Sequence, residues 1–212
     1  CSNYGLIPNE SYADENHSLN PLSDYSKAKI AIEKYILSLK NQTSTTMTIL
    51  RFATAFGLSD RMRFDLTLNE FVYDIYNQNK LEVFDEHTWR PYCHVLDFSK
   101  LIQIVLEADK KLINSEIFNA GGKSNHASKK NLVDKILNYT HSNNIEYLKN
   151  GNDPRNYRVN FNKASSLLNF KVNYSIDDGI IEIINALKKN LYKDVSINKT
   201  SYGNYLIANE KF

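Results

Sequence analysis

A tyrosine and a lysine four residues apart, Tyr25 and Lys29, carry the clearest chemical signal in this 212-residue sequence. They fall in residues 24–33, which are typical of the start of an amphipathic helix, where side chains at this spacing share a face. A phenol has a pKa of about 10 and becomes a useful acid or base at neutral pH only when a cation favours the phenolate. Lys29 supplies that charge, so the pair predicts a tyrosine that moves a proton. A packed ring beside a solvated ammonium is the alternative that the pair alone leaves open.

Three further blocks flank this pair. Residues 2–5 (SNYG) precede it, and residues 50–57 (LRFATAFG) and 90–97 (RPYCHVLD) follow it. In this order the blocks resemble the extended short-chain dehydrogenase/reductase family, specifically its NAD-dependent nucleotide-sugar epimerases and dehydratases, as far as about residue 189. The resemblance implies the C-terminal part of a Rossmann-type, doubly wound parallel sheet with a smaller mixed α/β substrate-binding lobe. NAD is the implied cofactor, with NADP not excluded, and a nucleotide-diphosphate sugar is the implied partner.

One family feature is absent from the sequence. Members begin with a strand, a GxxGxxG turn and a helix whose N-terminus holds the cofactor pyrophosphate. This sequence has 7 glycines, its only pair is Gly121-Gly122, and it starts at Cys1 rather than Met. We therefore expect the C-terminal part of a longer enzyme, inactive and unable to bind NAD tightly by itself. An upstream in-frame strand-GxxGxxG-helix would test this expectation.

The resemblance also implies roles for the residues nearest the chemistry. Tyr25 takes the proton from a sugar hydroxyl while hydride passes to the nicotinamide, and Lys29 lowers the pKa of Tyr25 and binds the nicotinamide ribose. The family's catalytic Ser or Thr would fall just before Cys1, so Ser2 is the nearest candidate, with a locally bonded serine as the alternative. Ala53 and Thr54 match the loop that approaches the nicotinamide, although a threonine there equally suits a helix cap.

The start of the sequence bears on the type of reaction. Similar dehydratases place Glu, often after Asp, where this sequence has Cys1 and Ser2, because elimination of water needs a carboxyl group to move protons. Neither residue is acidic, which favours oxidation and re-reduction at one sugar carbon, as in a 4-epimerase. A reductase or dehydratase of the same family remains an alternative, and so does a non-catalytic remnant that binds sugar nucleotides.

Four residues are candidates for substrate binding. The resemblance implies that Arg90 binds the diphosphate, and a guanidinium fork matches phosphate oxygens bidentately. Asn69 resembles an Asn that donates to the phosphates, with a surface Asn as the alternative. Asp153 and Arg155 fall in residues 153–158, which resemble a block that contacts the ribose and phosphates. The better-known pattern has an Arg three residues before the Asp, where this sequence has Asn150.

Other polar residues receive weaker predictions. Arg158 is an alternative to Arg155, and Arg61 and Arg63 could face the diphosphate or simply be solvated. We expect structural roles for His94, as a hydrogen-bonded strand residue, and for Asp97, as a helix N-cap.

Composition excludes several other classes of protein. The formal net charge is +2, and no Lys/Arg run is long enough for a nucleic-acid or membrane-surface patch. Cys1 and Cys93 are too few for a disulfide framework and lack the spacing of a zinc site. No apolar run approaches the length of a membrane helix, and no signal peptide is evident. We expect a cytoplasmic enzyme that is a homodimer when full length and binds neither metal, nucleic acid nor membrane.

Periodicity predicts the elements that position these residues. We expect a strand end at residues 1–5, strands at 47–52, 81–84, 116–121 and 145–148, and helices at 22–40, 66–77, from 97, 128–139, 163–168 and 175–189. The first helix should bury an apolar stripe made of Ala28, Ile32, Tyr35, Ile36 and Leu39. Residues 1–57 and 86–120 would form most of the Rossmann part, and 58–85 and 121–189 most of the substrate-binding lobe. Residues 190–212 form a polar tail without an assigned role.

Overall fold

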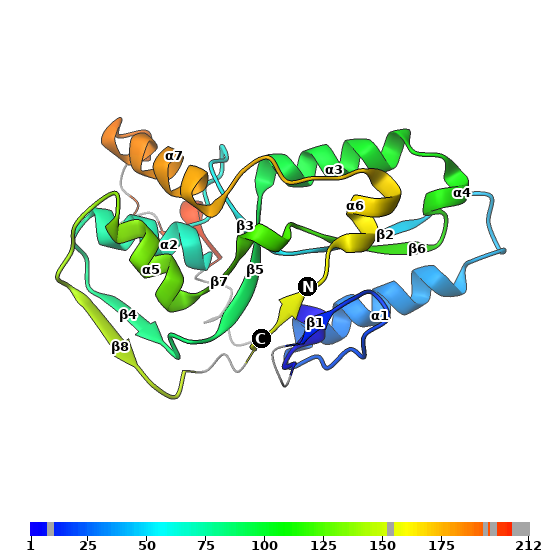
Figure 1. The fold of residues 1–212 in the computed structure, drawn as a ribbon, viewed down its shortest axis with the longest axis horizontal. Coiled ribbons are helices and arrows are strands. Elements are labelled where there is room, and N and C mark those ends of the chain that lie inside the picture. Colours follow the sequence, from blue (N-terminus) through cyan, green and yellow to red (C-terminus); the bar gives the residue numbers. More distant parts are fainter. Residues whose placement is uncertain (8–10, 152–154, 193–194, 196–198, 205–212) are drawn as a thin grey trace.

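A parallel pair of strands forms the centre of one half of the molecule. The computed structural model describes residues 1–7, 11–151, 155–192, 195 and 199–204. Strand β2 (Thr48–Phe52) pairs in parallel with β6 (Glu116–Ala120) along its whole length. Figure 1 shows this pair with helix α1 (Asp24–Ser38) on one side, and α3 (Val95–Glu107) and α6 (Asn162–Leu168) on the other. Helices on both faces of parallel strands are the doubly wound arrangement that the sequence predicted.

Apolar packing explains the position of α3 and α6. One buried cluster joins Leu101 and Val105 of α3 to Phe118 of β6 and to Ala164 and Leu168 of α6. The short helix α4 (Lys110–Ile113) leads directly into β6. Because α6 packs on β6, it adjoins the Rossmann part, although the predicted lobe boundary placed it in the range 121–189. The predicted division into two domains stays a prediction.

The other half is mixed α/β. Strand β3 (Thr54–Phe56) pairs in parallel with β5 (Trp89–His94), which pairs antiparallel with β7 (His126–Ser128). Strands β4 (Leu81–Phe84) and β8 (Ile145–Leu148) form a second parallel pair. Helices α2 (Thr67–Tyr76), α5 (Lys129–Leu137) and α7 (Ile176–Lys188) surround the largest apolar cluster, which includes Phe56, Leu68 and Ile180. Figure 1 shows these helices grouped at the end of the molecule opposite β2 and β6.

Several short elements lie outside these two groups. The 3-10 helix η1 (Ser2–Tyr4) opens it, where the sequence analysis predicted a strand end. That prediction was wrong: the backbone turns at Gly5, at φ +65°, a conformation that glycine adopts readily and that ends any extended run. Strand β1 (Tyr12–Ala13) pairs in parallel with β9 (Arg158–Val159), and the 3-10 helix η3 (Lys199–Tyr202) is the last described element.

Local capping fixes three helix starts. Ser23, Ser128 and Ser175 each accept a hydrogen bond from the backbone N–H three residues on, and form reciprocal capping boxes. The starts predicted at Ser128 and Ser175 are confirmed. The predicted cap at Asp97 was wrong, because His94 caps α3 three residues earlier and accepts a hydrogen bond from Leu96 N.

The predicted apolar stripe of α1 was also wrong. The buried residues of this helix are Ser26, Ile30 and Glu33, while Ile32 and Tyr35 are exposed. Periodicity misled here because a buried ion pair between Glu33 and Arg51 joins α1 to β2. No helix within the described part of the chain is both long and apolar enough to cross a membrane, and the cytoplasmic location stays a prediction.

Candidate active site

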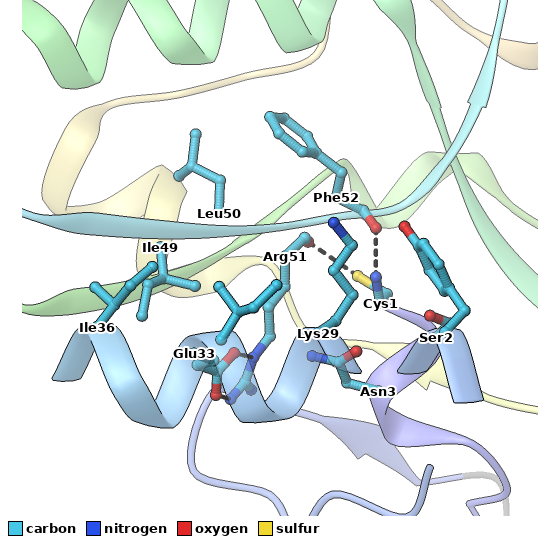
Figure 2. Close-up of a pocket in the computed structure, with 12 residues that line it drawn as sticks. Cys1, Ser2, Asn3, Lys29, Glu33, Ile36, Ile49, Leu50, Arg51 and Phe52 are labelled. Atoms are coloured by element: carbon cyan, nitrogen blue, oxygen red, sulfur yellow. Dashed lines mark hydrogen bonds and ion pairs between the residues drawn. The ribbon is translucent and has the colours of Figure 1, made fainter. Parts of the chain in front are cut away.

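The first residues of the chain, α1 and β2 enclose a cavity of about 230 Å³. Cys1, Ser2 and Asn3 line it together with Tyr25 and Lys29 of α1 and with residues 49–52 of β2. Figure 2 shows Cys1, Ser2 and Lys29 near Phe52, with Ile36 at the opposite end. The structure therefore brings together the three residues that the sequence singled out for catalysis.

Tyr25 and Lys29 are accessible within this site. Tyr25 is 64% exposed, and the ammonium nitrogen of Lys29 lies 5.3 Å from the centroid of its ring. Tyr25 is the second residue of α1, so its phenol also stands near the positive end of the helix dipole. A phenol beside a cation and open to solvent can exchange a proton with a bound hydroxyl group.

A buried ion pair anchors α1 to β2 beside the cavity. Arg51 donates from Nε to Glu33 Oε2 at 2.9 Å and from Nη2 to Glu33 Oε1 at 2.5 Å. The two side chains are 4% and 7% exposed. Burial alone would lower the pKa of Arg51, but its bonds to Glu33 and Tyr4 outweigh that effect and raise the pKa above its usual value.

The same ion pair reaches the beginning of the chain. Arg51 Nη1 donates to Tyr4 Oη at 2.8 Å, and Tyr4 Oη lies 2.7 Å from Asn119 Oδ1 of β6. Asn119 N donates to Glu15 Oε1 at 2.7 Å. These bonds hold η1, which carries Ser2, against both strands. The sequence alone did not reveal this network, although the charged Arg51 within a largely apolar strand was an available signal.

Ala53 and Thr54 follow the cavity-lining residue Phe52 directly. Ala53 is buried and donates its N–H to Ala120 O at 2.9 Å, and Thr54 pairs with Tyr92 in the β3–β5 ladder. They therefore lie where the chain passes from β2 to β3. Neither is a helix cap.

None of the candidate substrate residues that the structure describes lines this cavity. Asn69 is buried, accepts a hydrogen bond from Gly57 N at 3.3 Å and donates to Arg63 O at 3.0 Å. Arg90 is 6% exposed; its Nη1 donates to the carbonyls of Trp89, at 2.9 Å, and of Arg155. Asp153 lies outside the described residues. The phosphate-binding roles of these residues stay predictions.

His94 and Asp97 have structural contacts, although Asp97 does not form the N-cap expected of it. His94 Nε2 lies 2.6 Å from Glu182 Oε1 of α7. The ring of His94 stacks on that of Tyr174, with the two centroids 4.3 Å apart. Asp97 is buried and accepts hydrogen bonds from Asn173 N at 2.9 Å and Tyr174 N at 3.1 Å. Glu182 also accepts from Leu58 N at 2.9 Å, so α7 is tied to the chain that follows β3.

A second cavity, between α2 and β4, contains a carboxyl group with a perturbed pKa. Burial and the charges of Asp74 and Asp65 raise the pKa of Glu70 from 4.5 to about 7, against the effect of Lys129. The folded protein keeps this proton at pH values where the unfolded chain has lost it. Stability should therefore fall as the pH rises from about 4.5 to about 7.

Glu70→Gln should remove this pH dependence. Because Glu70 is only partly buried, we expect the variant to be more stable than the parent at pH 8 by about 1–2 kcal/mol, and equally stable at pH 4. Urea unfolding between pH 4 and 8 measures the difference. Glu82→Gln, in the surface pair with Lys80 on the same cavity, is the control. If the difference in unfolding free energy between Glu70→Gln and the parent is the same at every pH from 4 to 8, the prediction is contradicted.

Helices on both faces of a parallel strand pair, with Tyr25 and Lys29 one turn apart on the helix beside it, define part of a Rossmann-type α/β fold of the extended short-chain dehydrogenase/reductase kind. The chain belongs to the NAD dependent epimerase/dehydratase family, whose model matches residues 1–121.

Individual relatives agree with this assignment. The chain is 30% identical over 182 residues to the uncharacterized UDP-glucose epimerase YtcB of Bacillus subtilis (strain 168). The matched segment covers 84% of this chain and 56% of that relative. Among solved structures, it resembles UDP-glucuronic acid 4-epimerase from Bacillus cereus in complex with UDP-glucuronic acid and NAD, with a TM-score of 0.78 and 25% identity over 90% of this chain and 60% of that one.

A dehydratase shares the fold. The dTDP-glucose 4,6-dehydratase from Bacillus anthracis, solved in complex with NAD, gives a TM-score of 0.78 and 23% identity over 94% of this chain and 62% of that one. The chain thus spans between 56% and 62% of the length of these three proteins.

Proposed function

We propose that the whole protein catalyses the NAD-dependent 4-epimerisation of a UDP-activated hexose or hexuronic acid. The observation that carries this proposal is the cavity where Ser2, Tyr25 and Lys29 meet. Relatives whose names specify UDP-glucose or UDP-glucuronate epimerases support the substrate class.

The residues of the cavity fit the nicotinamide-ribose end of NAD. Lys29 offers an exposed ammonium donor, and Tyr25 offers an accessible phenol. NAD, when bound, supplies the acceptor and then the donor of hydride. Tyr25 takes the proton of the sugar hydroxyl as the carbon is oxidised, and returns it when the carbon is reduced from the other face. Lys29 binds the ribose and stabilises negative charge on the phenol oxygen, and Ser2 offers a hydroxyl on the substrate side.

The carboxylate of the cavity favours epimerisation over dehydration. Elimination of water needs a carboxyl group that can exchange protons with the sugar. Among the described residues that line this cavity, Glu33 is the only carboxylate, and both of its oxygens are bound by buried Arg51. Cys1 and Ser2 add none, so epimerisation at one carbon is the better fit.

Product analysis tests this function. We expect the whole protein with NAD to convert UDP-glucose or UDP-glucuronic acid into its 4-epimer, detected by proton NMR of the anomeric signals. Parallel reactions with NADP test the choice of cofactor. A 4-keto-6-deoxy product would identify a dehydratase instead, and an inert protein that binds UDP-sugars would support a non-catalytic binding role.

We also propose that the whole protein is a homodimer. Ile32 and Tyr35 expose apolar surface on α1. Sedimentation velocity measures the assembly, and a monomer at micromolar concentration would contradict it.

Arg90→Ala should weaken nucleotide binding. If Arg90 binds the diphosphate, the loss of its charge-assisted bonds should cost about 1.5–3 kcal/mol of UDP affinity, with turnover at saturating substrate unchanged. Calorimetric titration with UDP measures the effect. Because Arg90 also bonds the carbonyl of Arg155, thermal unfolding of each variant is needed, and Arg90→Lys separates charge from fork geometry. Unchanged UDP affinity in a less stable variant would assign Arg90 to the fold alone.

A further inference from the structure

The C-terminal segment packs on a loop in the middle of the chain. We define the clasp as the described residues between 191 and 204, and the β3–α2 loop as residues 57–66. Phe64 of the loop contacts two clasp tyrosines edge-on or tilted, with centroids 5.6 Å from Tyr192 and 6.0 Å from Tyr202. The rings of the two tyrosines pack edge-on against each other, with their centroids 5.9 Å apart. Val195 of the clasp is buried in the same apolar cluster as Phe64.

Polar bonds join the same two segments. Phe64 N donates to Tyr202 O at 2.7 Å, and Tyr192 Oη donates to Ser59 O at 3.2 Å. Arg61 Nη2 donates to Asn204 Oδ1 at 3.1 Å. Asn204 N donates to Asp65 Oδ2 at 3.0 Å. The clasp thus binds the loop at four positions between residues 59 and 65.

The β3–α2 loop lies in a functionally important place. It leaves the carboxyl end of β3, and ligands of open α/β sheets bind outside the carboxyl ends of the strands. Its first residues are held by Asn69 of α2, through Gly57 N, and by Glu182 of α7, through Leu58 N. Residues 59–65, which carry Arg61 and Arg63, contact both α2 and the clasp: Asn69 donates to Arg63 O at 3.0 Å and Tyr73 packs on Phe64, while the clasp supplies the four bonds above. Arg63 donates from Nε to Asp65 Oδ1 at 2.5 Å and from Nη2 to Asp65 Oδ2 at 2.7 Å. Asp65 in turn accepts a hydrogen bond from Asn204 N.

We propose that the clasp fixes the β3–α2 loop in the shape that receives the nucleotide part of the substrate, with Tyr192 and Tyr202 as positioning residues. This inference rests on the proposed function for the identity of the ligand. The effect of the clasp on the loop rests on the contacts above and needs no ligand. The clasp acts through the loop, and neither tyrosine needs to touch the ligand.

Limited trypsin digestion tests the clasp without any assay of activity. Trypsin cleaves after Arg61 and Arg63, and cleavage in a folded protein follows local opening. We expect Tyr202→Ala in the full chain to raise the rate of cleavage at these two sites about tenfold, and Tyr202→Phe, which keeps the ring, to leave it unchanged. Cleavage after Arg51, whose side chain is 4% exposed in β2, reports general unfolding. If cleavage at Arg61 and Arg63 is unchanged, or if cleavage at Arg51 rises equally, the clasp is overturned.

Ligand binding tests the positioning role. We expect Tyr202→Ala in the whole protein to weaken UDP binding about tenfold in calorimetric titration, and to raise KM for the UDP-sugar with kcat unchanged. Tyr202→Phe should restore both values. If Tyr202→Ala is cleaved faster but binds UDP with normal affinity, the positioning role of the clasp is overturned. If the unaltered protein binds no UDP, the proposed function and the ligand half of this inference both fail, while the trypsin result still decides whether the clasp exists.

Discussion

Tyr25→Phe should lower the turnover of the whole enzyme by a factor of about 10²–10⁴, the usual cost of removing a general acid–base group. The phenol is needed only as the hydroxyl proton moves, so its loss raises the barrier without weakening the bound ground state. UDP affinity should therefore stay close to that of the parent protein. Steady-state kinetics and calorimetric titration of the same preparation measure the two quantities.

The same helix offers a matched control for this variant. Tyr35 is 64% exposed, as Tyr25 is, but does not line the cavity. Tyr35→Phe should leave turnover unchanged, since it removes the same hydroxyl group from a side chain outside the cavity. If Tyr25→Phe keeps most of its turnover, the acid–base role does not belong to this residue, whatever the reaction proves to be.

Glu33→Ala should lower the free energy of unfolding by about 3–5 kcal/mol, because it leaves the buried guanidinium of Arg51 without its carboxylate. The pair joins α1 to β2, so this loss should also loosen the helix that carries Tyr25. Urea unfolding of the parent and variant at pH 7 measures the change.

Two further variants separate the unpaired charge from the loss of packing. The double change Glu33→Leu with Arg51→Met removes both charges and should recover most of the lost stability. Asp24→Ala breaks the exposed pair with Lys27 on the same helix and should leave stability nearly unchanged. A Glu33→Ala variant as stable as Asp24→Ala would show that the ion pair contributes little to the fold.

Signals confined to a few neighbouring residues were interpreted correctly from the sequence. The capping boxes at Ser128 and Ser175 depend on contacts three residues apart, and both helices start where predicted. The strands at residues 81–84 and 145–148 have the predicted bounds. The placement of Tyr25 and Lys29 on one helix face follows from helical geometry alone, and the cavity confirms that the two lie together.

Signals that depend on distant partners were missed or misinterpreted. The apolar residues of α1 predicted the wrong buried face because the partner of this helix is Arg51, whose side chain buries Glu33 from 18 residues away. Asp97 resembled a helix cap, but the backbone N–H groups that it accepts belong to Asn173 and Tyr174, 76 and 77 residues away.

The sequence by itself determined the family, the α/β class and the placement of Tyr25 and Lys29 on one helix face, because these follow from residue types within short blocks of the chain. Only the tertiary structure decided which side chains are accessible. It placed Ser2 beside Tyr25, buried Arg90 and Asn69 among backbone groups, and joined Asn204 to Arg61 across 143 residues. The physical reason is that a polar group is buried only where another segment supplies its hydrogen-bond partner. That partner is set by how strands and helices pack, which residue spacing along the chain does not record.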